Sequence, residues 1–283
     1  MLSTSSGRFS WILKIAFCAF AVGAFVPLFF SGYSSASRDL HFVVSPSSQP
    51  GTDPSPEFFE QFISDVESDT VMVHSSTLTE LPNGKLMSVW FQGSREGASD
   101  IALYTSTFDP TDRSWSSPAI FIDREHAERE IGRRIKTIGN PVLFTDQEGR
   151  TWLFFVTVSF FGWSGGDINF KYSDDDGKTW TPAHRLELSP IPHSGTLVKG
   201  SPVEYTDGTL GLPAYRDYDR YSFPEFVRMD RTGGVLSRVP MANGKRGGLQ
   251  PSMVQFSDSR AVAFLRYNGV DPKRILRVAT ENG

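Results

Sequence analysis

From Val71 onward, apolar and polar positions repeat one plan four times. Each copy has a short apolar run, a tight polar turn containing Gly or Asp, and a second, longer apolar run. The copies are HSSTLTELPNGKLMSVWF from His74, NPVLFTDQEGRTWLFFVTV from Asn140, SPVEYTDGTLGLPAY from Ser201 and QPSMVQFSDSRAVAFLRY from Gln250. Two apolar runs joined by such a turn predict a β-hairpin, so we expect four hairpins.

The spacing of these hairpins indicates the architecture. The turn centres are 65, 59 and 51 residues apart, at Gly84, Gly149, Gly208 and Ser259. A further apolar run follows each hairpin, at residues 101–105, 168–173, 226–230 and 275–280. Repeats of this length with three or four strands are typical of propeller blades, and not of sandwiches or helical solenoids. We therefore predict an all-β propeller with about four blades.

One short motif follows the second hairpin. Residues 173–180 read SDDDGKTW, which is S-x-D-x-G-x-T-W. The Ser and Asp side chains of such a turn can bond to its backbone, Gly supplies a positive φ, and Trp packs between sheets. A calcium loop is the rival interpretation of three consecutive aspartates, but the EF-hand spacing and its closing Glu are missing. The motif therefore predicts a structural turn.

With these hairpins and this motif, residues 70–283 resemble the sialidase-like proteins with BNR (Asp-box) repeats, described as predicted neuraminidases. Degenerate copies of the motif occur at residues 106–115 and 230–237, and residues 280–283 read like the start of another. The resemblance implies a sialidase-type β-propeller, which has six blades in the family. Because about four are present, we expect a propeller that is incomplete at its C-terminus. The alternative is an open four-blade arc, which must cover its edge strands in another way.

The blade plan predicts where chemistry is located. In a propeller, the first strand of each blade lines the central channel, so the residues that open these strands gather at one mouth. The strand-opening residues are His74, Asn140, Lys199 with Ser201, and Gln250. Loops between second and third strands reach the same mouth with Arg95, Glu96, Asp100, Trp163, Asp167, Tyr215, Arg216, Asp217 and Arg266. We expect the Asp-box turns on the opposite face.

The resemblance to sialidases assigns roles to some of these residues. Sialidases combine arginines that bind the sugar carboxylate, an Asp acid/base and a Tyr nucleophile activated by a Glu. By resemblance, Arg266 corresponds to the second of these arginines. His74 stands at the position of the first arginine, and Gln250 at the position of the Glu. A histidine can still donate to an anion, but a glutamine cannot act as a base. The tyrosine and the third arginine are expected beyond residue 283.

The loop at residues 93–100, GSREGASD, carries the candidate acids. Glu96 or Asp100 takes the place of the family's acid/base carboxylate, and we favour Asp100 because it directly precedes a strand. The alternative is a solvated loop in which Arg95 and Glu96 neutralise each other.

Four further side chains are candidates for substrate binding. Trp163 offers a stacking face for a sugar ring, or belongs to the core. Lys199 reaches into the mouth to meet an anionic group, or is a surface lysine. Tyr215 recognises hydroxyl groups, or belongs to an ordinary loop. Asn140 precedes a proline, which predicts an extended backbone and a partly structural role.

A charged stretch at residues 123–136, DREHAEREIGRRIK, lies between the first two hairpins. It predicts a solvated helical insertion between blades, with a substrate lid as the alternative.

Residues 1–36 have the pattern of an export signal. They contain no acidic residue, carry Arg8 and Lys14, and run apolar over residues 15–30 before a small-residue stretch. Ser34 and Ala36 fit a small-x-small site, which predicts cleavage after residue 36. The alternative is a retained anchor that tethers the protein to a membrane through residues 11–30. In both cases we expect export to the periplasm or the extracellular space.

Residues 37–69 are expected to link this signal to the propeller domain at residues 70–283. Residues 45–56 contain four prolines and no large apolar side chain, which predicts an extended linker. Phenylalanine, isoleucine and valine recur at helical spacing over residues 58–66. This spacing predicts a short amphipathic helix, or an outer strand, that docks on the domain.

Charge and cysteine content exclude several classes. The net charge of -4 argues against a nucleic-acid partner. The single cysteine, Cys18, excludes an intrachain disulfide, and the clustered Cys and His of a zinc module are absent from the sequence. Cys18 follows the bulky Phe17, which argues against lipid attachment. We expect neither a metal nor a cofactor, and the oligomeric state is left open.

Three functions fit these patterns. The leading hypothesis is an exported sialidase-like exo-glycosidase that hydrolyses terminal acidic sugars of glycans. The alternative is a non-catalytic glycan-binding propeller, indicated by His74 and Gln250 in place of Arg and Glu. A third is a lyase on an acidic polysaccharide. In each case the partner is a glycan or glycoconjugate.

Overall fold

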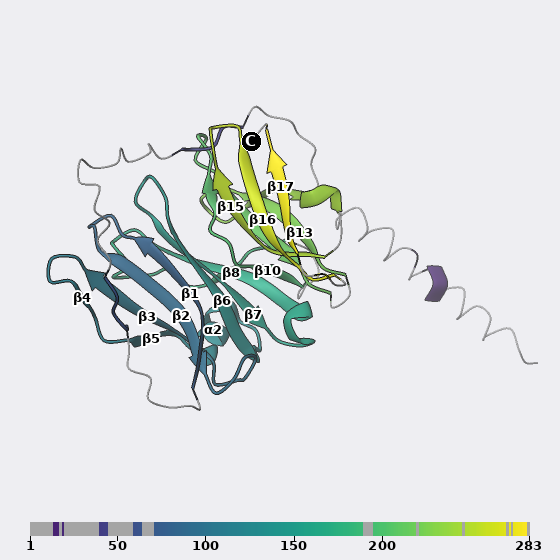
Figure 1. The fold of residues 1–283 in the computed structure, drawn as a ribbon. Helices are drawn as coiled ribbons and strands as arrows, with labels where there is room; N and C mark the ends of the chain where they lie inside the picture. Colours follow the sequence, from purple (N-terminus) through teal and green to yellow (C-terminus); the bar gives the residue numbers. More distant parts are fainter. Residues whose placement is uncertain are drawn as a thin grey trace, which may run out of the picture.

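The computed structural model describes residues 14–16, 19, 40–44, 59–63, 71–188, 195–218, 221–244, 247–269, 272 and 274–281. Strands dominate this part of the chain and form four antiparallel sheets that follow one another in sequence (Figure 1). We call these sheets blades 1 to 4. The four-bladed, all-β propeller that the repeats predict is confirmed.

Each blade begins with the hairpin that the sequence predicts. Blade 1 consists of β1 (Met72–Glu80), β2 (Leu86–Gly93), β3 (Ala102–Asp109), β4 (Ser114–Trp115) and β5 (Ala119–Ile122). Blade 2 consists of β6 (Thr137–Thr145), β7 (Thr151–Val158), β8 (Gly166–Ser173) and β9 (His184–Arg185). Blade 3 consists of β10 (Thr196–Val198), β11 (Val203–Glu204), β12 (Leu210–Arg216), β13 (Phe223–Met229) and β14 (Val235–Pro240). Blade 4 consists of β15 (Gly248–Gln255), β16 (Ala261–Tyr267) and β17 (Ile275–Thr280).

The core consists of apolar layers between neighbouring blades. Strand β7 is buried along its whole length because blades pack against both of its faces. Trp152, Phe154 and Val156 belong to the layer shared with blade 3. Leu153 and Phe155, which point the other way, belong to the layer shared with blade 1. Adjacent strand residues face opposite sides, which explains why TWLFFVTV is a continuous apolar run and does not alternate.

Residues 40–44 dock on the junction of blades 3 and 4. Phe42 is buried, stacks on Tyr205 with ring centroids 4.9 Å apart, and joins a small cluster with Val203 and Ala261. Its backbone N–H donates to the carbonyl of Asp258 at 2.5 Å. Residues 40–44, which lie within the predicted linker segment 37–69, thus dock on the propeller.

The helix predicted over residues 58–66 is described only in part. Residues 59–63 are not helical, and Phe59 and Phe62 are exposed. The guanidinium of Arg113 lies 4.9 Å from the ring centre of Phe59. The rest of that segment, like most of residues 1–36, lies outside the described residues. No helix among the described residues is long and apolar enough to cross a membrane.

The Asp-box forms the turn between β8 and β9, as predicted. Asp175 accepts hydrogen bonds from the Thr179 side chain at 2.6 Å and from its backbone N–H at 2.8 Å. Ser173 Oγ donates to Asp175 and accepts from the backbone N–H of Gly177, whose φ is 76°. Trp180 packs edge-on against Phe121 and so joins the layer between blades 1 and 2. The motif is therefore structural.

Protonation of Asp175 is expected to weaken this turn. Hydrogen bonds from Thr179 and then Ser173 lower the pKa of Asp175 from its ordinary 3.8 to about 2. A carboxylate with a lowered pKa stabilises the fold above its unfolded-state pKa, and this contribution is lost as the pH falls through the folded-state pKa. The free energy of unfolding of the parent chain should therefore approach that of Asp175→Asn between about pH 4 and pH 2. Urea titrations of both proteins at each pH test this, and a constant difference would contradict it.

Two weaker copies of the motif also form turns between third and fourth strands. Asp230 Oδ1 accepts from the side chain of Thr232 at 2.6 Å and from the N–H of Gly234 at 2.9 Å. In blade 1, Phe108 and Trp115 pack across the turn with ring centroids 5.3 Å apart. These turns confirm that the degenerate copies are in register with the full motif.

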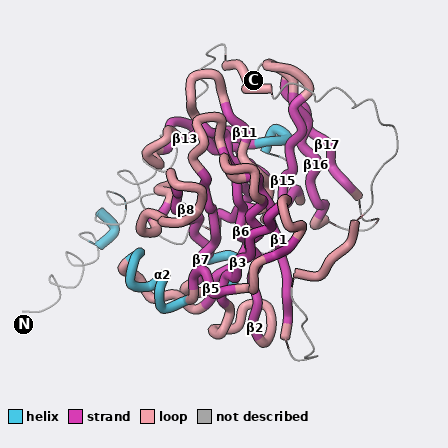
Figure 2. The backbone as a smooth tube through the Cα atoms, turned by 90° about the vertical axis from the view of Figure 1, so that its left-hand side faces the viewer, coloured by secondary structure: helices cyan, strands magenta, loops and turns pink. Residues whose placement is uncertain are grey.

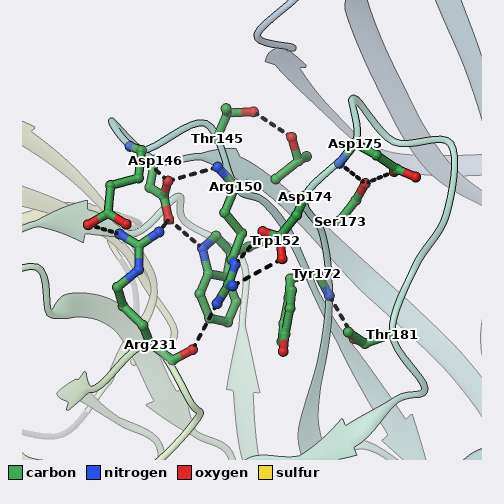
Figure 3. A network of polar contacts seen from close by, with 12 residues as sticks. Thr145, Asp146, Arg150, Trp152, Tyr172, Ser173, Asp174, Asp175, Thr181 and Arg231 are labelled. Atoms are coloured by element: carbon green, nitrogen blue, oxygen red, sulfur yellow. Dashed lines mark hydrogen bonds and ion pairs between the residues drawn. The ribbon is translucent and has the colours of Figure 1, made fainter.

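A polar network joins blades 2 and 3 beside the Asp-box (Figure 3). Arg150 binds both carboxylate oxygens of Asp174, at 2.7 and 3.1 Å, and lies over the Tyr172 ring. Arg231 of the β13–β14 turn binds Asp146 at 2.7 Å, and the same carboxylate accepts from the indole N–H of Trp152 at 2.9 Å. Charged side chains thus join the β6–β7 turn of blade 2 to the β13–β14 turn of blade 3.

The charged stretch after blade 1 forms α2 (Arg124–Ile131), as predicted, and Figure 2 shows this helix at the outside of the strands. The Asp123 carboxylate caps its first turn and Gly132 ends it in a left-handed conformation. The buried ammonium of Lys171 on β8 binds both carboxylate oxygens of Glu130, at 2.8 and 2.6 Å. This ion pair holds α2 on blade 2.

A second buried ion cluster lies within blade 3. Arg216 Nε lies 3.2 Å from Glu225 Oε1, and Arg238 Nη2 lies 2.7 Å from Glu225 Oε2. All three side chains are at most 2% exposed. Arg216 was expected in a loop at the mouth, and the structure places it instead inside the blade as a partner of Glu225.

Candidate functional site

The first strand of every blade is interrupted at a similar distance before its hairpin turn. The register shifts between His74 and Thr77 in β1, between Gly139 and Val142 in β6, and between Leu249 and Ser252 in β15. In blade 3 the first strand is split into β10 and β11 by residues 199–202. β-bulges re-aim side chains and are concentrated next to functional sites.

Three of these interruptions place a residue other than glycine in the left-handed region. The φ angles are 62° for Ser75, 47° for Asn140 and 51° for Gln250. The extended backbone predicted for Asn140 before its proline is therefore wrong, because the bulge imposes a positive φ that asparagine tolerates better than most residues. Strain of this kind persists where the surrounding structure enforces it, typically at functional sites.

The interrupted positions meet through side-chain contacts. Lys199 Nζ donates to Ser75 Oγ, and Asn140 Nδ2 donates to the Tyr215 hydroxyl at 3.3 Å. The side chain of Gln250 lies close enough to the Tyr215 hydroxyl to lower its pKa. These five residues, Ser75, Asn140, Lys199, Tyr215 and Gln250, are called the strand-bulge cluster below.

The backbone after Lys199 closes the cluster on the side of blade 4. A Cβ atom added to Gly200 would lie 2.1 Å from the carbonyl oxygen of Pro251. Only glycine allows this approach, which brings Lys199 beside the residue that follows Gln250.

Four of the five cluster residues, Asn140, Lys199, Tyr215 and Gln250, are among the predicted site residues, and Ser75 is not. The turn centres offered a signal, because Ser75, Asn140, Lys199 and Gln250 each stand nine positions before their own turn centre: 84 − 75, 149 − 140, 208 − 199 and 259 − 250 all equal 9. His74 was predicted because it opens the first apolar run and stands at the position of the family's first arginine. In the structure His74 is exposed and its ring stacks on Phe91, with centroids 5.5 Å apart.

Burial sets the charge states in the cluster. Lys199 is half-buried, and this burial lowers its pKa below the ordinary value of 10.5. Tyr215 is 4% exposed, and burial raises its pKa to about 12 although Gln250, Asn140 and the charge of Arg266 act in the opposite direction. At neutral pH Tyr215 is therefore a neutral hydrogen-bonding phenol and not a phenolate. The cluster combines one cationic donor with neutral amide and hydroxyl groups, which suits recognition of an anion and its neighbouring hydroxyls.

Trp163 lies next to the cluster. It belongs to the 3-10 helix η1 (Gly162–Gly165), is half-buried and packs on the layer between blades 2 and 3. A Cβ added to Gly139 would lie 2.9 Å from Trp163 Cη2, so the indole covers the residue before Asn140.

The loop with the candidate acids is closed by Asp100. Its two carboxylate oxygens accept from the N–H and the hydroxyl of Ser94, both at 3.0 Å. Arg95, Glu96 and Asp100 are exposed, and no hydrogen bond among the described residues joins them to the strand-bulge cluster. The ion pair considered for Arg95 and Glu96 does not form within the described part of the chain.

The remaining predicted residues have mixed positions. Arg266 on β16 is exposed and close enough to Tyr215 to influence its titration. Ser201 is exposed, and Asp217 accepts from the Ser222 hydroxyl at 3.0 Å. Asp167 is buried, with Arg133 and Arg185 nitrogens 3.8 and 3.9 Å from its carboxylate, so it belongs to the structural charges. Among the described residues, no three His, Cys, Asp or Glu side chains are grouped to hold a metal ion.

Comparison with known proteins relates this fold to a family. The model of the BNR repeat-like domain matches residues 84–283. No curated protein matches the sequence.

Several solved structures share the fold. The Hadza microbial sialidase Hz136 is 16% identical, with a TM-score of 0.58 over 74% of this chain and 46% of that chain. A leech intramolecular trans-sialidase is 13% identical, with a TM-score of 0.58 over 79% of this chain and 51% of that chain. The NanB sialidase from Streptococcus pneumoniae is 13% identical, with a TM-score of 0.54 over 78% of this chain and 52% of that chain. The chain spans about half the length of these structures. At such identities, the likeness shows a sialidase-type propeller fold.

Proposed function

Because the chain belongs to the BNR repeat-like domain family, we propose that its strand-bulge cluster binds the terminal acidic sugar of a glycan. The observation that carries this proposal is Lys199, a half-buried cation among neutral hydrogen-bonding groups. Structures with this fold that bear the name sialidase support the choice of an acidic sugar.

The charge of Lys199 favours an anionic ligand. No carboxylate in the described part of the chain pairs with it, and its described partner is the neutral Ser75 hydroxyl. A half-buried ammonium without a counter-charge is costly, and a sugar carboxylate would supply that charge. An ammonium group has three donors, so Ser75 leaves two for the ligand.

Neighbouring side chains fit the rest of a sugar. Asn140 and Gln250 carry both donors and acceptors, which pair with ring hydroxyls. Trp163 presents an aromatic surface beside Asn140 for the apolar face of a sugar ring. Arg266, on the side of Tyr215, adds a second positive charge within the field of the site.

A glycan array tests the proposal directly. We expect the protein to be retained on glycans that end in a carboxylated sugar, and not on matched glycans from which this sugar has been removed. Retention that does not depend on the acidic sugar would overturn the proposal. A fluorogenic sialoside, assayed in parallel, reports whether bound sugar is also released.

Hydrolysis of the acidic sugar is the second candidate function. It is supported by the sialidases among the similar structures and by Asp100 or Glu96 as the acid. Binding ranks above hydrolysis because Gln250 stands at the position of the family's Glu and cannot act as a base for a nucleophile. If fluorophore is released, Asp100→Asn should abolish the release and Glu96→Gln should retain it; the reverse result would assign the acid to Glu96. An unsaturated product that absorbs in the ultraviolet would indicate a lyase instead.

We propose further that the protein is exported, on the pattern of residues 1–36. N-terminal sequencing of the protein recovered from outside the cytoplasm tests cleavage after residue 36, and an intact Met1 start would indicate a retained anchor.

A further inference from the structure

Two adjacent phenylalanines project from the loop between β7 and η1. Phe160 is 61% exposed and Phe161 is 88% exposed, with ring centroids 6.5 Å apart. Phe161 has a φ of 60°, which is unfavourable for an aromatic residue and would suit glycine. Packing among the described residues does not account for the exposure of the Phe161 ring, which points to a partner outside the chain.

The backbone of this loop is held tightly from behind. A Cβ added to Gly165 would lie 2.0 Å from the carbonyl oxygen of Phe160, so the loop folds closely on itself. A Cβ added to Gly195 would lie 2.7 Å from the carbonyl oxygen of Ser164, which anchors η1 to blade 3. The two rings are therefore presented on a fixed support.

Basic residues lie beside the start of this loop. The Lys136 N–H donates to the Val158 carbonyl at 2.7 Å, and the Ser159 hydroxyl donates to the Arg134 carbonyl. These bonds place residues 134–136 beside the start of the loop, and the side chains of Arg134 and Lys136 are exposed. Neither forms an ion pair with another described residue. We call Phe160, Phe161, Arg134 and Lys136 the aromatic-basic patch.

The local charge is opposite to that of the whole chain. Residues 129–136 contain four basic side chains and one acidic one, Glu130, whereas the chain carries a net charge of -4. Glu130 is engaged by Lys171 and so does not neutralise the patch. A positive surface next to projecting aromatic rings fits a partner that offers both dense negative charge and an apolar interior.

We propose that the aromatic-basic patch docks the propeller on a bilayer that contains anionic phospholipid. Phe160 and Phe161 enter the interface between headgroups and acyl chains, and Arg134 and Lys136 meet the lipid phosphates. A sugar is the weaker fit, because the two rings present no polar group for its hydroxyls, and carbohydrate would not bury both side chains in an apolar phase.

Docking in this manner positions the strand-bulge cluster. Trp163, two residues after Phe161, covers Gly139 beside Asn140, so the loop that carries the two rings contacts the strand that carries Asn140. A docked propeller would therefore meet glycans carried by membrane lipids, a consequence that rests on the proposed function. The docking itself does not.

A fluorophore at residue 161 tests the docking. The chain has one cysteine, so Phe161→Cys in a Cys18→Ser background can be labelled with nitrobenzoxadiazole at a single site. Emission should rise and shift to the blue with phosphatidylcholine vesicles that contain phosphatidylglycerol, and change little with phosphatidylcholine alone. The matched control is the same label at Phe256→Cys, because Phe256 is also an exposed phenylalanine but lies in blade 4. Because the label reports its own surroundings, vesicle binding through residues 11–30 does not produce the signal.

Equal responses at both positions, or none at residue 161, would overturn the proposal. A response at residue 161 to a soluble acidic oligosaccharide and not to vesicles would also overturn it, and would assign the patch to the glycan. The vesicles carry no sugar, so this outcome is independent of glycan binding by the strand-bulge cluster.

Charge reversal provides a second test. Arg134→Glu with Lys136→Glu should lower the docking equilibrium, read from the label at residue 161, by about tenfold or more, because each basic residue contributes to attraction by anionic lipid. Lys178→Glu, an exposed lysine in the Asp-box, should leave it unchanged. Equal effects of the two substitutions would contradict a specific patch.

Discussion

Lys199→Met is expected to weaken binding of an acidic glycan by about two orders of magnitude. The substitution keeps an unbranched side chain but removes the half-buried charge that we propose meets the sugar carboxylate. Breaking a buried charge pair costs more than breaking an exposed one, since the carboxylate is left desolvated without a partner. Titration of a labelled sialoside into both proteins measures the loss.

The matched control is Lys178→Met. Lys178 is exposed in the Asp-box turn and its Nζ lies 3.7 Å from Asp176, so its loss should change glycan affinity little. Comparable losses for Lys178→Met and Lys199→Met would reduce the effect to net charge and contradict a specific role for Lys199.

The pH dependence of glycan binding tests whether the positive charge of Lys199 contributes to affinity. Burial lowers the pKa of Lys199, so its positive charge is lost at a lower pH than for an exposed lysine. Affinity should therefore fall as the pH rises towards the alkaline range, earlier than surface lysines would cause, and Lys199→Met should lack this fall.

Glu225→Gln is expected to lower the free energy of unfolding by about 3–5 kcal/mol. Glu225 is the acidic partner of both Arg216 and Arg238, and all three side chains are buried in blade 3. Glutamine has nearly the same shape, but it removes the negative charge that both buried guanidinium groups contact. The loss is a large share of the roughly 5–15 kcal/mol that holds a typical domain folded. Urea denaturation followed by tryptophan fluorescence measures it.

Glu187→Gln is the control for this experiment. Glu187 also binds an arginine, with Arg185 Nη2 2.9 Å from Oε1, but its side chain is 77% exposed. We expect its loss to cost less than about 1 kcal/mol because water replaces the partner. If both substitutions cost the same, burial does not determine the strength of the cluster in blade 3.

The blades could be predicted from sequence because their signals are local and repeated. Turn residues and apolar runs recur at similar spacing, and the hydrogen bonds of Ser173, Asp175 and Trp180 that shape the Asp-box turn lie within the motif. Such features do not depend on which blade lies next to which.

Features that depend on contacts between distant residues were harder to predict. Arg216 was expected in a loop at the mouth, but it is the last residue of β12, and its partner Glu225 on β13 holds it inside the blade. Phe42 lies before a proline-rich segment and carries no local sign that Tyr205 will cover it.

The backbone at the candidate site could not be predicted from local preferences. Local preference before proline favoured an extended Asn140, whereas the bulge in β6 requires a positive φ. In blade 1, His74 was predicted from its place at the start of the apolar run, whereas the distance to the turn centre indicates Ser75.

The constant nine-residue interval fixes the distance between each bulge and the turn of its own blade. It sets how deep each bulge sits independently of which amino acid occupies it, so the four positions can exchange side chains without moving the scaffold. Deleting one residue inside this interval would shift the strand register by one residue and move the side chain at the bulge to the opposite face of the sheet. Substitutions at these four positions can therefore change the ligand preference, whereas an insertion or deletion between bulge and turn would disrupt the strand.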